Sequence, residues 1–339
     1  MSVSLELFQR LSQQRILVIG DVMIDRYLTG KVSRISPEAP VPVVEFQESQ
    51  NRLGGAANVA LNLKALGAEV ILCSVIGQDE NTDVFLQLLP ALRLSAKGIM
   101  TSEERMTTVK TRVIANNQHL LRVDREDTHE LSEGEADRFL EQIKQILKDD
   151  AIDLILFQDY NKGVLSTRVI KEVIAEALQH NIPTAVDPKF HNFWAYEKVT
   201  LFKPNLKEIR SQLPFSITTS LNDLNKAADF IREKLNNQST VITLSEKGLF
   251  VMEGQNSKIF PTQARSIADV CGAGDTVISV LALGLAAGQT DLSEIAKLAN
   301  LAGGQVCEKV GVVPVDRQQL QEEYEALLHR ELLDSASTE

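Results

Sequence analysis

Short, almost wholly apolar runs alternate with amphipathic stretches along most of the chain. Residues 15–20, RILVIG, form a β-branched run that ends in glycine, which is typical of a buried parallel strand. Residues 54–77 combine a glycine pair, a helical apolar stripe and a second buried run. From about residue 132 the alternation becomes regular. The pattern predicts a three-layer α/β domain with a mostly parallel sheet and helices on both faces.

Two segments break this rhythm. Residues 25–47 alternate apolar and polar side chains around three prolines, and residues 98–125 are rich in Thr and Val with an Asn-Asn turn signal at 116–117. Both predict extended chain outside the main sheet, a small β lid inserted into one domain of residues 1–330. Residues 331–339 are expected to be a polar tail. Because exposed strand edges invite pairing, we expect a homodimer through the lid.

Charge and composition narrow the classes of function. The formal net charge of −11 argues against nucleic acid or an anionic membrane as partner, although a cleft with a few cations can still bind a small anion. No apolar run approaches the roughly 20 residues that span a bilayer, and no export signal starts the chain. The three cysteines and five histidines show no metal-ligand spacing. A cytoplasmic protein is expected.

The sharpest local motif is DVCGAGD at 269–275, which precedes an apolar helix. Small residues at a helix entrance let backbone N–H groups face an anion, and the helix dipole adds positive potential. Asp275 could then accept a proton from an attacking hydroxyl while Gly272, Ala273 and Gly274 stabilise a transferring phosphoryl group. The alternative is that Asp275 only favours the helix start and the glycines only make a turn.

Two groups near the N-terminus are candidates for binding hydroxyls. Gly54 and Gly55 would let a ligand approach the backbone, and the amide of Asn58 could bond a hydroxyl in two directions, although Asn58 could equally be a helix cap. Asp21 and Asp25 follow the first strand, at the edge where open α/β sheets bind ligands. Strand-end aspartates are also ordinary turn residues.

Two groups in the second half are candidates for a nucleotide. Asn205 and Glu208 lie three apart at a helix start and could hold hydrated magnesium, although the same spacing makes a plain capping box. Residues 243–248, TLSEKG, lie between two strands. They could contact nucleotide phosphates or simply form a hairpin.

In this order, the motifs resemble the signatures of the ribokinase-like, or phosphofructokinase B, family of carbohydrate kinases over nearly the whole chain. The resemblance implies ATP and Mg²⁺ as cofactors, leaves a monovalent cation possible, and places the lid over a sugar. It makes Asp275 the base, residues 272–274 the anion hole, and Asn205 with Glu208 the contacts to magnesium and phosphates. The implied sugar contacts are Asp21, Asp25, Gly54, Gly55 and Asn58, and the implied nucleotide contacts are Thr243, Ser245, Gly248 and Asn300.

Residues 20–46, DPK at 187–189 and KPNLKE at 203–208 are similar, more closely, to the heptose 7-phosphate kinases of this family. That similarity implies synthesis of heptose 1,7-bisphosphate for lipopolysaccharide core, by a kinase that stands alone because the chain leaves no room for a nucleotidyl-transferring domain. The chain departs from the usual pattern at Cys271, often Thr, and at Val280, usually a small residue. The substrate phosphate would need cations, expected from Arg34, Lys110, Arg112 and Lys189, which could also be solvated surface residues.

Two other functions stay open from the sequence. The same fold serves many alcohols, so the substrate could be another sugar, a sugar phosphate or a nucleoside. A nucleotide-binding regulator that has lost turnover would be a different class of protein, and the intact Asp275, Gly274 and Glu208 argue against it.

Overall fold

The main sheet is built around β1 (Arg15–Gly20), which lies in parallel register between β4 (Glu69–Gly77) and β8 (Leu154–Gln158). The computed structural model describes residues 3–116, 118–288 and 291–336. Their main sheet has nine strands in the order β13-β12-β11-β10-β9-β8-β1-β4-β5. The other strands are β5 (Ile99–Ser102), β9 (Thr184–Asp187), β10 (Leu201–Phe202), β11 (Ser239–Thr243), β12 (Leu249–Glu253) and β13 (Asn256–Phe260). All pair in parallel except β12 and β13, which are antiparallel.

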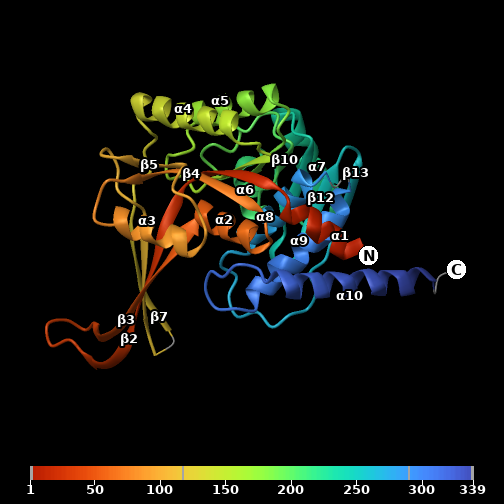
Figure 1. The fold of residues 1–339 in the computed structure, drawn as a ribbon. Coiled ribbons are helices and arrows are strands. Elements are labelled where there is room, and N and C mark those ends of the chain that lie inside the picture. The colour runs from red at the N-terminus through yellow and green to blue at the C-terminus, as the bar shows by residue number, and fades with distance from the viewer. Residues whose placement is uncertain (1–2, 117, 289–290, 337–339) are drawn as a thin grey trace.

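Helices cover both faces of this sheet, as predicted (Figure 1). Alternate residues of β1 enter different cores: Ile16 and Val18 pack on one side, Leu17 and Ile19 on the other. The first face carries α1 (Val3–Ser12), α2 (Ala56–Ala65), α3 (Thr82–Ala91), α8 (Ala273–Ala286), α9 (Leu292–Cys307) and α10 (Arg317–Ala336). The second carries α4 (Glu133–Asp149), α5 (Thr167–Gln179), α6 (Leu206–Gln212) and α7 (Leu221–Leu235).

A second, four-stranded sheet projects from the body at the lower left of Figure 1. Its order is β3-β2-β6-β7, formed by β2 (Val22–Ile35), β3 (Pro42–Gly55), β6 (Val109–Ala115) and β7 (Gln118–Arg125). The chain passes from β1 to β2 through Asp21 alone, so the root of the small sheet lies at the carboxyl end of a central strand. This is the edge where open α/β sheets bind ligands.

Three boundaries differ from the sequence prediction. β3 runs to Gly55, because Gly54 and Gly55 pair with Met23 and Val22 as the end of a strand before the helix starts. Residues 99–102 belong to the main sheet rather than to the lid. The last helix continues to Ala336 beyond the predicted end near 330, since no glycine or proline stops it. Asn117 of the predicted turn and residues 337–339 of the predicted tail lie outside the described residues.

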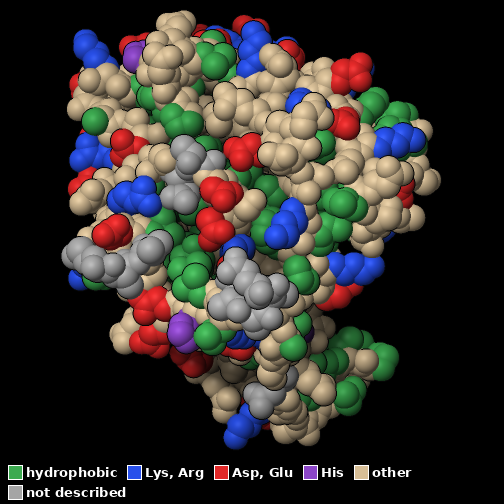
Figure 2. All heavy atoms as spheres, turned by 90° about the vertical axis from the view of Figure 1, so that its right-hand side faces the viewer, with side chains coloured by type: hydrophobic (Ala, Val, Ile, Leu, Met, Phe, Trp, Pro, Cys, Tyr) green, Lys and Arg blue, Asp and Glu red, His purple; other side chains and the backbone are tan. Residues whose placement is uncertain are grey.

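Among the described helices, none forms a layer over either face of the small sheet (Figure 1). In Figure 2 hydrophobic side chains gather at the lower end of the molecule, where this sheet lies. The small sheet exposes Phe46 of β3, 64% exposed, and Leu121 of β7, 58% exposed. Among the described helices, none is long and apolar enough to cross a membrane.

Candidate active site

Asp275 lies in the first turn of α8 and is almost fully buried, with 7% of its surface exposed. Three side chains donate hydrogen bonds to its carboxylate. Asn58 Nδ2 donates to Oδ2 at 2.7 Å, and Tyr160 Oη and Gln158 Nε2 donate to Oδ1 at 2.7 and 3.2 Å. Burial raises the pKa of Asp275 to about 6, although the bonds from Asn58 and Tyr160 oppose the shift. A carboxylate that loses its proton near pH 6 suits a general base at neutral pH.

The N-terminus of α8, residues 272–275, which we call the mouth of α8, has the backbone geometry of an anion site. Gly272, the N-cap, has φ of +81°, a conformation that glycine adopts without strain. A Cβ on Gly272 would lie 3.2 Å from Asn58 Nδ2, so the turn passes directly over that amide. The Ala273 N–H makes one long bond, 3.4 Å, to the Val270 carbonyl, and the Gly274 N–H belongs to the first turn, where no helical carbonyl can pair with it.

On one side of this mouth lie two lysines. Lys203 is buried and its Nζ is 3.1 Å from Asp187 Oδ2, and a Cβ on Gly274 would lie 4.0 Å from the same Nζ. Lys189 Nζ is 2.7 Å from Glu208 Oε1 and 5.5 Å from the centre of the Tyr160 ring. Burial lowers the pKa of Lys189, but Asp187 and Glu208 outweigh that effect and raise it, so the ammonium stays charged.

Asn205 and Glu208 adjoin these lysines and form a complete capping box at the start of α6. Asn205 Oδ1 accepts from the Glu208 N–H, and Glu208 Oε2 accepts from the Asn205 N–H, both at 2.8 Å. Asn205 and Glu208 therefore do cap the helix, as the simpler interpretation of their spacing predicted. Binding of hydrated magnesium is compatible with this capping box, because each oxygen of the Glu208 carboxylate keeps a second lone pair.

The other side of the mouth is formed by the root of the small sheet. Arg112 Nη1 is 2.5 Å from Asp25 Oδ1. Tyr27 lies between two guanidinium groups, with Arg52 at 5.1 Å and Arg112 at 5.4 Å from its ring centre. Lys110 and Arg52 both pair with Asp25 in the strand register, so all of these side chains share one face of the sheet.

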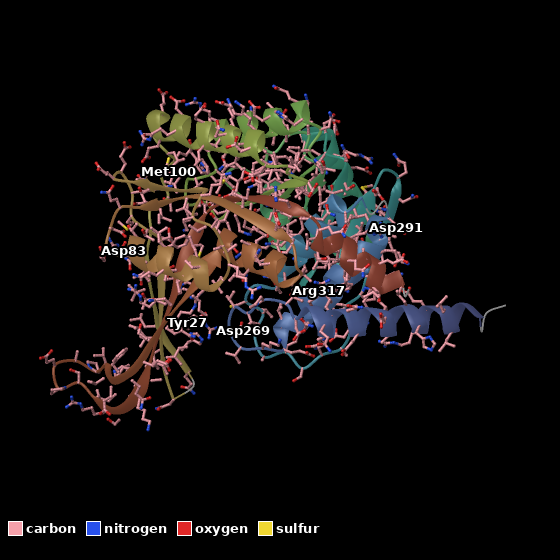
Figure 3. The ribbon with its side chains drawn as sticks, viewed as in Figure 1. Tyr27, Asp83, Met100, Asp269, Asp291 and Arg317 are labelled. Atoms are coloured by element: carbon pink, nitrogen blue, oxygen red, sulfur yellow. The ribbon has the colours of Figure 1, made fainter. Side chains whose placement is uncertain are left out.

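This face is turned toward the loops around α8. A Cβ on Gly311 would lie 3.2 Å from Arg52 Nη1, and the Gly311 N–H donates to Asp269 Oδ2 at 3.0 Å. Figure 3 accordingly shows Tyr27 at the root of the small sheet, next to the loop that carries Asp269. Gly54 is required here, since a Cβ would lie 2.2 Å from Asp25 Oδ2. Gly55 has φ of +63°, and a Cβ there would lie 2.4 Å from the Asp21 carbonyl oxygen.

Three expected substrate contacts lie elsewhere. Asp21 uses both carboxylate oxygens to accept backbone N–H groups of Tyr160, Lys162 and Val164, so it anchors that loop. Lys189 lies on the Glu208 side of the mouth rather than with Asp25. Arg34 is exposed near the far end of β2, nine residues beyond Asp25, which is roughly 30 Å along a strand.

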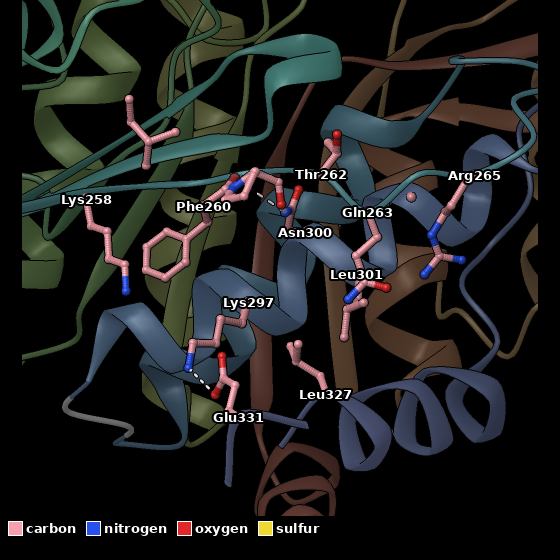
Figure 4. A pocket seen from close by; sticks show the side chains of 13 residues that line it. Lys258, Phe260, Thr262, Gln263, Arg265, Lys297, Asn300, Leu301, Leu327 and Glu331 are labelled. Atoms are coloured by element: carbon pink, nitrogen blue, oxygen red, sulfur yellow. Dashed lines mark hydrogen bonds and ion pairs between the residues drawn. The ribbon is translucent and has the colours of Figure 1, made fainter. Parts of the chain in front are cut away.

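The expected nucleotide contacts lie along one path. Thr243 forms an isolated parallel bridge with Asn205 at the end of β11. Ser245 and Gly248, both at positive φ, make the turn into β12, which contacts the chain after β13 through a bond from Thr262 Oγ1 to the Glu246 carbonyl at 2.6 Å. Thr262 and Asn300 line a cavity of about 300 Å³ between the end of β13, α9 and α10 (Figure 4). Of the expected nucleotide contacts, only Asn300 lines this cavity.

Cys271 has a free thiol next to the start of α8. Burial raises the pKa of its thiol to about 11, with Asp269 adding to the shift and Arg112 opposing it, so the group is protonated at neutral pH. Within the described part of the chain, no three His, Cys, Asp or Glu side chains gather as they would to hold a metal ion.

The sequence pattern of the pfkB family carbohydrate kinases matches residues 13–318. The chain belongs to the pfkB family. It is 43% identical over 319 residues to the bifunctional protein HldE of Nitratiruptor, and 40% identical over 298 residues to HldE of Helicobacter pylori. Those alignments cover 93% and 88% of this chain but 66% and 64% of the two relatives, so the chain spans less than two thirds of either.

Solved structures share the fold of this pfkB kinase at low sequence identity. Phosphofructokinase-2 from Escherichia coli, in complex with potassium, superposes with a TM-score of 0.76 at 20% identity, covering 93% of this chain and 99% of that one. Ribokinase from Arabidopsis thaliana, complexed with ribose and ATP, gives 0.69 at 14% identity, with coverages of 91% and 99%. The ribokinase-like fold and the carbohydrate kinase class predicted from the sequence are thus confirmed.

Several side chains of this pfkB site were not singled out from the sequence. Asp187 and Lys203 lie inside the DPK and KPNLKE motifs, which could have indicated them. Gln158 and Tyr160 follow a buried strand, the position where ligand contacts are expected in this fold class. Arg52 carried no local signal, because only the register of β3 against β2 brings it beside Asp25.

Proposed function

We propose that this ATP-dependent carbohydrate kinase phosphorylates heptose 7-phosphate at its anomeric hydroxyl, giving heptose 1,7-bisphosphate for lipopolysaccharide core synthesis. The observation that carries the reaction is the buried Asp275 carboxylate, bonded to Asn58 at the mouth of α8. The substrate proposal rests on the 40–43% identity to HldE proteins. ATP as donor and the absence of disulfides among Cys73, Cys271 and Cys307 fit a reaction in the cytoplasm.

In the proposed reaction Asp275 takes the proton of the sugar hydroxyl as its oxygen attacks the γ-phosphorus of ATP. The bond from that phosphorus to the β–γ bridging oxygen breaks, and ADP leaves with the electron pair. The first-turn N–H groups of α8 and the ammonium of Lys203 would stabilise the charge on the transferring group. Asp25, Gly54 and Asn58 would hold the sugar, with the small sheet closing over it as a lid.

Two buried acceptors support a hydroxyl-bearing ligand. Asn58 Oδ1 and Gln158 Oε1 are buried without a hydrogen-bond partner, while the nitrogens of the same amides donate to Asp275. A buried acceptor without a partner is costly and is normally satisfied by a ligand or water. Neighbouring hydroxyls of a sugar are donors of the right kind.

Magnesium is expected near Asn205 and Glu208, where when bound it would neutralise phosphate charge. Because Asn205 Oδ1 and both Glu208 oxygens already accept one hydrogen bond or ion pair each, the two residues fit a hydrated ion held through water better than a fully dehydrated one. A monovalent cation remains part of the proposal, and phosphofructokinase-2 of Escherichia coli has been solved with potassium.

Cations at the root of the small sheet would bind the phosphate already present on the substrate. Arg112 is neutralised by Asp25, but within the described residues no carboxylate lies within ion-pair distance of Arg52 or Lys110. Burial lowers the pKa of Lys110, as expected of an ammonium without a counter-ion. Three cations against one carboxylate leave an excess of positive charge for an anionic substrate.

The apolar face of the small sheet would form a homodimer. Leu121 and Val123 of β7 pair with Val113 and Thr111, which alternate with Arg112 on β6 and so lie on the face opposite the cations. Replacing Leu121 by Lys should convert a dimer to a monomer in analytical ultracentrifugation, whereas replacing Leu178 of α5 by Lys should not, although Leu178 is 49% exposed and Leu121 58%. A wild-type monomer at micromolar concentration would contradict the proposal.

An ADP-release screen tests the function directly. Heptose 7-phosphate, unphosphorylated heptose, fructose 6-phosphate and ribose would be compared at matched concentrations, and heptose 7-phosphate should give the highest kcat/KM by at least about tenfold. Higher kcat/KM with fructose 6-phosphate or ribose would identify another sugar as substrate. Absence of ADP release with any acceptor, nucleosides included, would favour a nucleotide-binding regulator.

A further inference from the structure

The two oxygens of the Asp275 carboxylate are held differently. Oδ1 accepts two hydrogen bonds, from Tyr160 Oη at 2.7 Å and from Gln158 Nε2 at 3.2 Å, whereas Oδ2 accepts one, from Asn58 Nδ2. A carboxylate oxygen has two lone-pair positions. Oδ1 is therefore saturated, and Oδ2 keeps one position for a further donor.

Neighbouring carboxylates fix the orientation of the side-chain amides of Gln158 and Asn58. Gln158 Nε2 also donates to Asp187 Oδ2 at 3.3 Å, so this nitrogen faces two carboxylates that can only accept. Its oxygen must point away from them. Asn58 Nδ2 likewise faces a carboxylate, which leaves Asn58 Oδ1 beside Oδ2 of the base as the acceptor without a partner. The open position on Oδ2 is thus next to an acceptor for a second hydroxyl.

We propose that Tyr160 and Gln158 are positioning residues, which saturate Oδ1 of Asp275 and thereby make Oδ2 the atom that takes the sugar proton. The inference rests on the proposed function, in which Asp275 is the base. It adds two residues that act on proton transfer through that carboxylate. Tyr160 is also bonded to Asp21 through its backbone N–H, and Gln158 keeps Oε1 as a buried acceptor.

Tyr160 is itself rigidly placed. Its backbone N–H donates to Asp21 Oδ2 at 2.8 Å, and Lys189 Nζ lies 5.5 Å from the centre of its ring. Burial and Asp275 raise the pKa of its hydroxyl well above the usual value, so it remains a donor across the working pH range. Asp21, expected to contact sugar, would thus act on the site indirectly by fixing this loop.

The charged groups facing Asp275 come from two segments: Asp187, the last residue of β9, with Lys189 two residues later, and Lys203 directly after β10. They remain in place when the Tyr160 hydroxyl is removed. A hydrogen bond to a carboxylate favours its charged form, so losing that bond must raise the pKa of Asp275. Because the deprotonated base is the active form, the acid limb of the kcat/KM profile should then move to higher pH.

The test compares Tyr160→Phe with Tyr196→Phe, which is a matched control. Tyr196 is also buried and also donates to a buried carboxylate, Asp159 Oδ2 at 2.8 Å, but it has no contact with Asp275. We expect Y160F to move the acid limb up by roughly one pH unit and to lower kcat about tenfold, with KM for ATP within about twofold. Y196F should leave the limb where it is. A substrate phosphate ionises in the same way with every variant, so the quantity to compare is the difference in the pH of the acid limb between each variant and the wild type.

Gln158→Met provides a second, nearly isosteric variant whose shift should have the same sign and be smaller, because its bond to Oδ1 is longer. If the acid limb of the kcat/KM profile stays at its wild-type pH in both Y160F and Q158M, and circular dichroism shows both variants folded, the positioning role is wrong. Equal shifts in Y160F and Y196F would overturn it too, since the effect would not be specific to Oδ1. Asp275→Asn separates the two proposals: if D275N keeps wild-type turnover, the proposed base itself is wrong, whatever Tyr160 does.

Discussion

The two sides of the α8 mouth both carry cations, but they differ in how the charge is balanced. On one side Lys203 is 2% exposed and paired with Asp187, and the more exposed Lys189, at 26%, is paired with Glu208, so each cation has its own carboxylate. On the other, Arg112 is 17% exposed and paired with Asp25, with Arg52 and Lys110 beside it and, among the described residues, without carboxylates of their own. A sealed, neutralised cation suits a phosphoryl group that is the same in every turnover. A more open excess of positive charge suits an anion that must enter and leave.

Asp275 lies between the two sides, so its replacement should affect both and have the largest effect. We expect D275N to lower kcat about 1,000-fold, because an amide cannot take the proton, while both KM values change little. Initial rates of ADP release measure this. A loss smaller than tenfold would show that another group accepts the proton.

The sealed side should respond in stability as well as in rate. Lys203→Met should lower kcat about 100-fold by removing a cation from the transferring group. It should also lower the free energy of unfolding by about 3–5 kcal/mol, because Asp187 is left buried without its partner.

Urea unfolding and ADP release measure the two effects of K203M separately. Lys97→Met is the matched control, since Lys97 pairs with Asp150 at 2.6 Å but is 44% exposed. Its loss should cost less than about 1 kcal/mol and leave kcat unchanged. Equal destabilisation by the two variants would remove the contrast between a sealed and an open side.

The sealed side is also where sequence reasoning succeeded in part. Asp275 and the turn at 272–274 lie within one heptapeptide, so the local pattern of a helix start is enough to place them at the start of α8, while their role in the reaction stays a prediction. Lys203 and Asp187 needed the sheet, because adjacent parallel strands β9 and β10 place them together. Tyr160 reaches Asp275 across 115 residues, a contact that no local pattern encodes.

The main sheet was easier to predict from sequence than the small sheet, which forms the open side. Long apolar runs such as β1 and β8 predicted the main sheet well, because strands buried on both faces have an unmistakable composition. The small sheet was predicted in kind but not in extent, since alternating strands do not mark their ends. Arg34 was consequently expected at the sugar, whereas the length of β2 carries it to the far end of the sheet. Asp21 was expected there too, and no local pattern shows that its carboxylate accepts three backbone N–H groups.

Binding of the substrate anion should depend on the open side alone. Arg112→Gln should raise KM for heptose 7-phosphate by about 10- to 100-fold through the loss of a charge-assisted contact, with KM for ATP within about twofold. Unphosphorylated heptose serves as the control substrate, and its KM should rise far less. If both sugars lose affinity equally, Arg112 acts by holding Asp25 rather than by binding phosphate.

Replacing Arg34 should have the smallest effect, and it tests how far along β2 the substrate-binding cations extend. Within its own chain it lies roughly 30 Å along β2 from Asp25, so Arg34→Gln should change KM for heptose 7-phosphate by less than about twofold. The measurement is best made at two protein concentrations, on either side of dimer dissociation. A larger rise that appears only in the dimer would mean that Arg34 reaches the site of a second copy. The cation cluster of Arg52, Lys110 and Arg112 would then be incomplete within one chain.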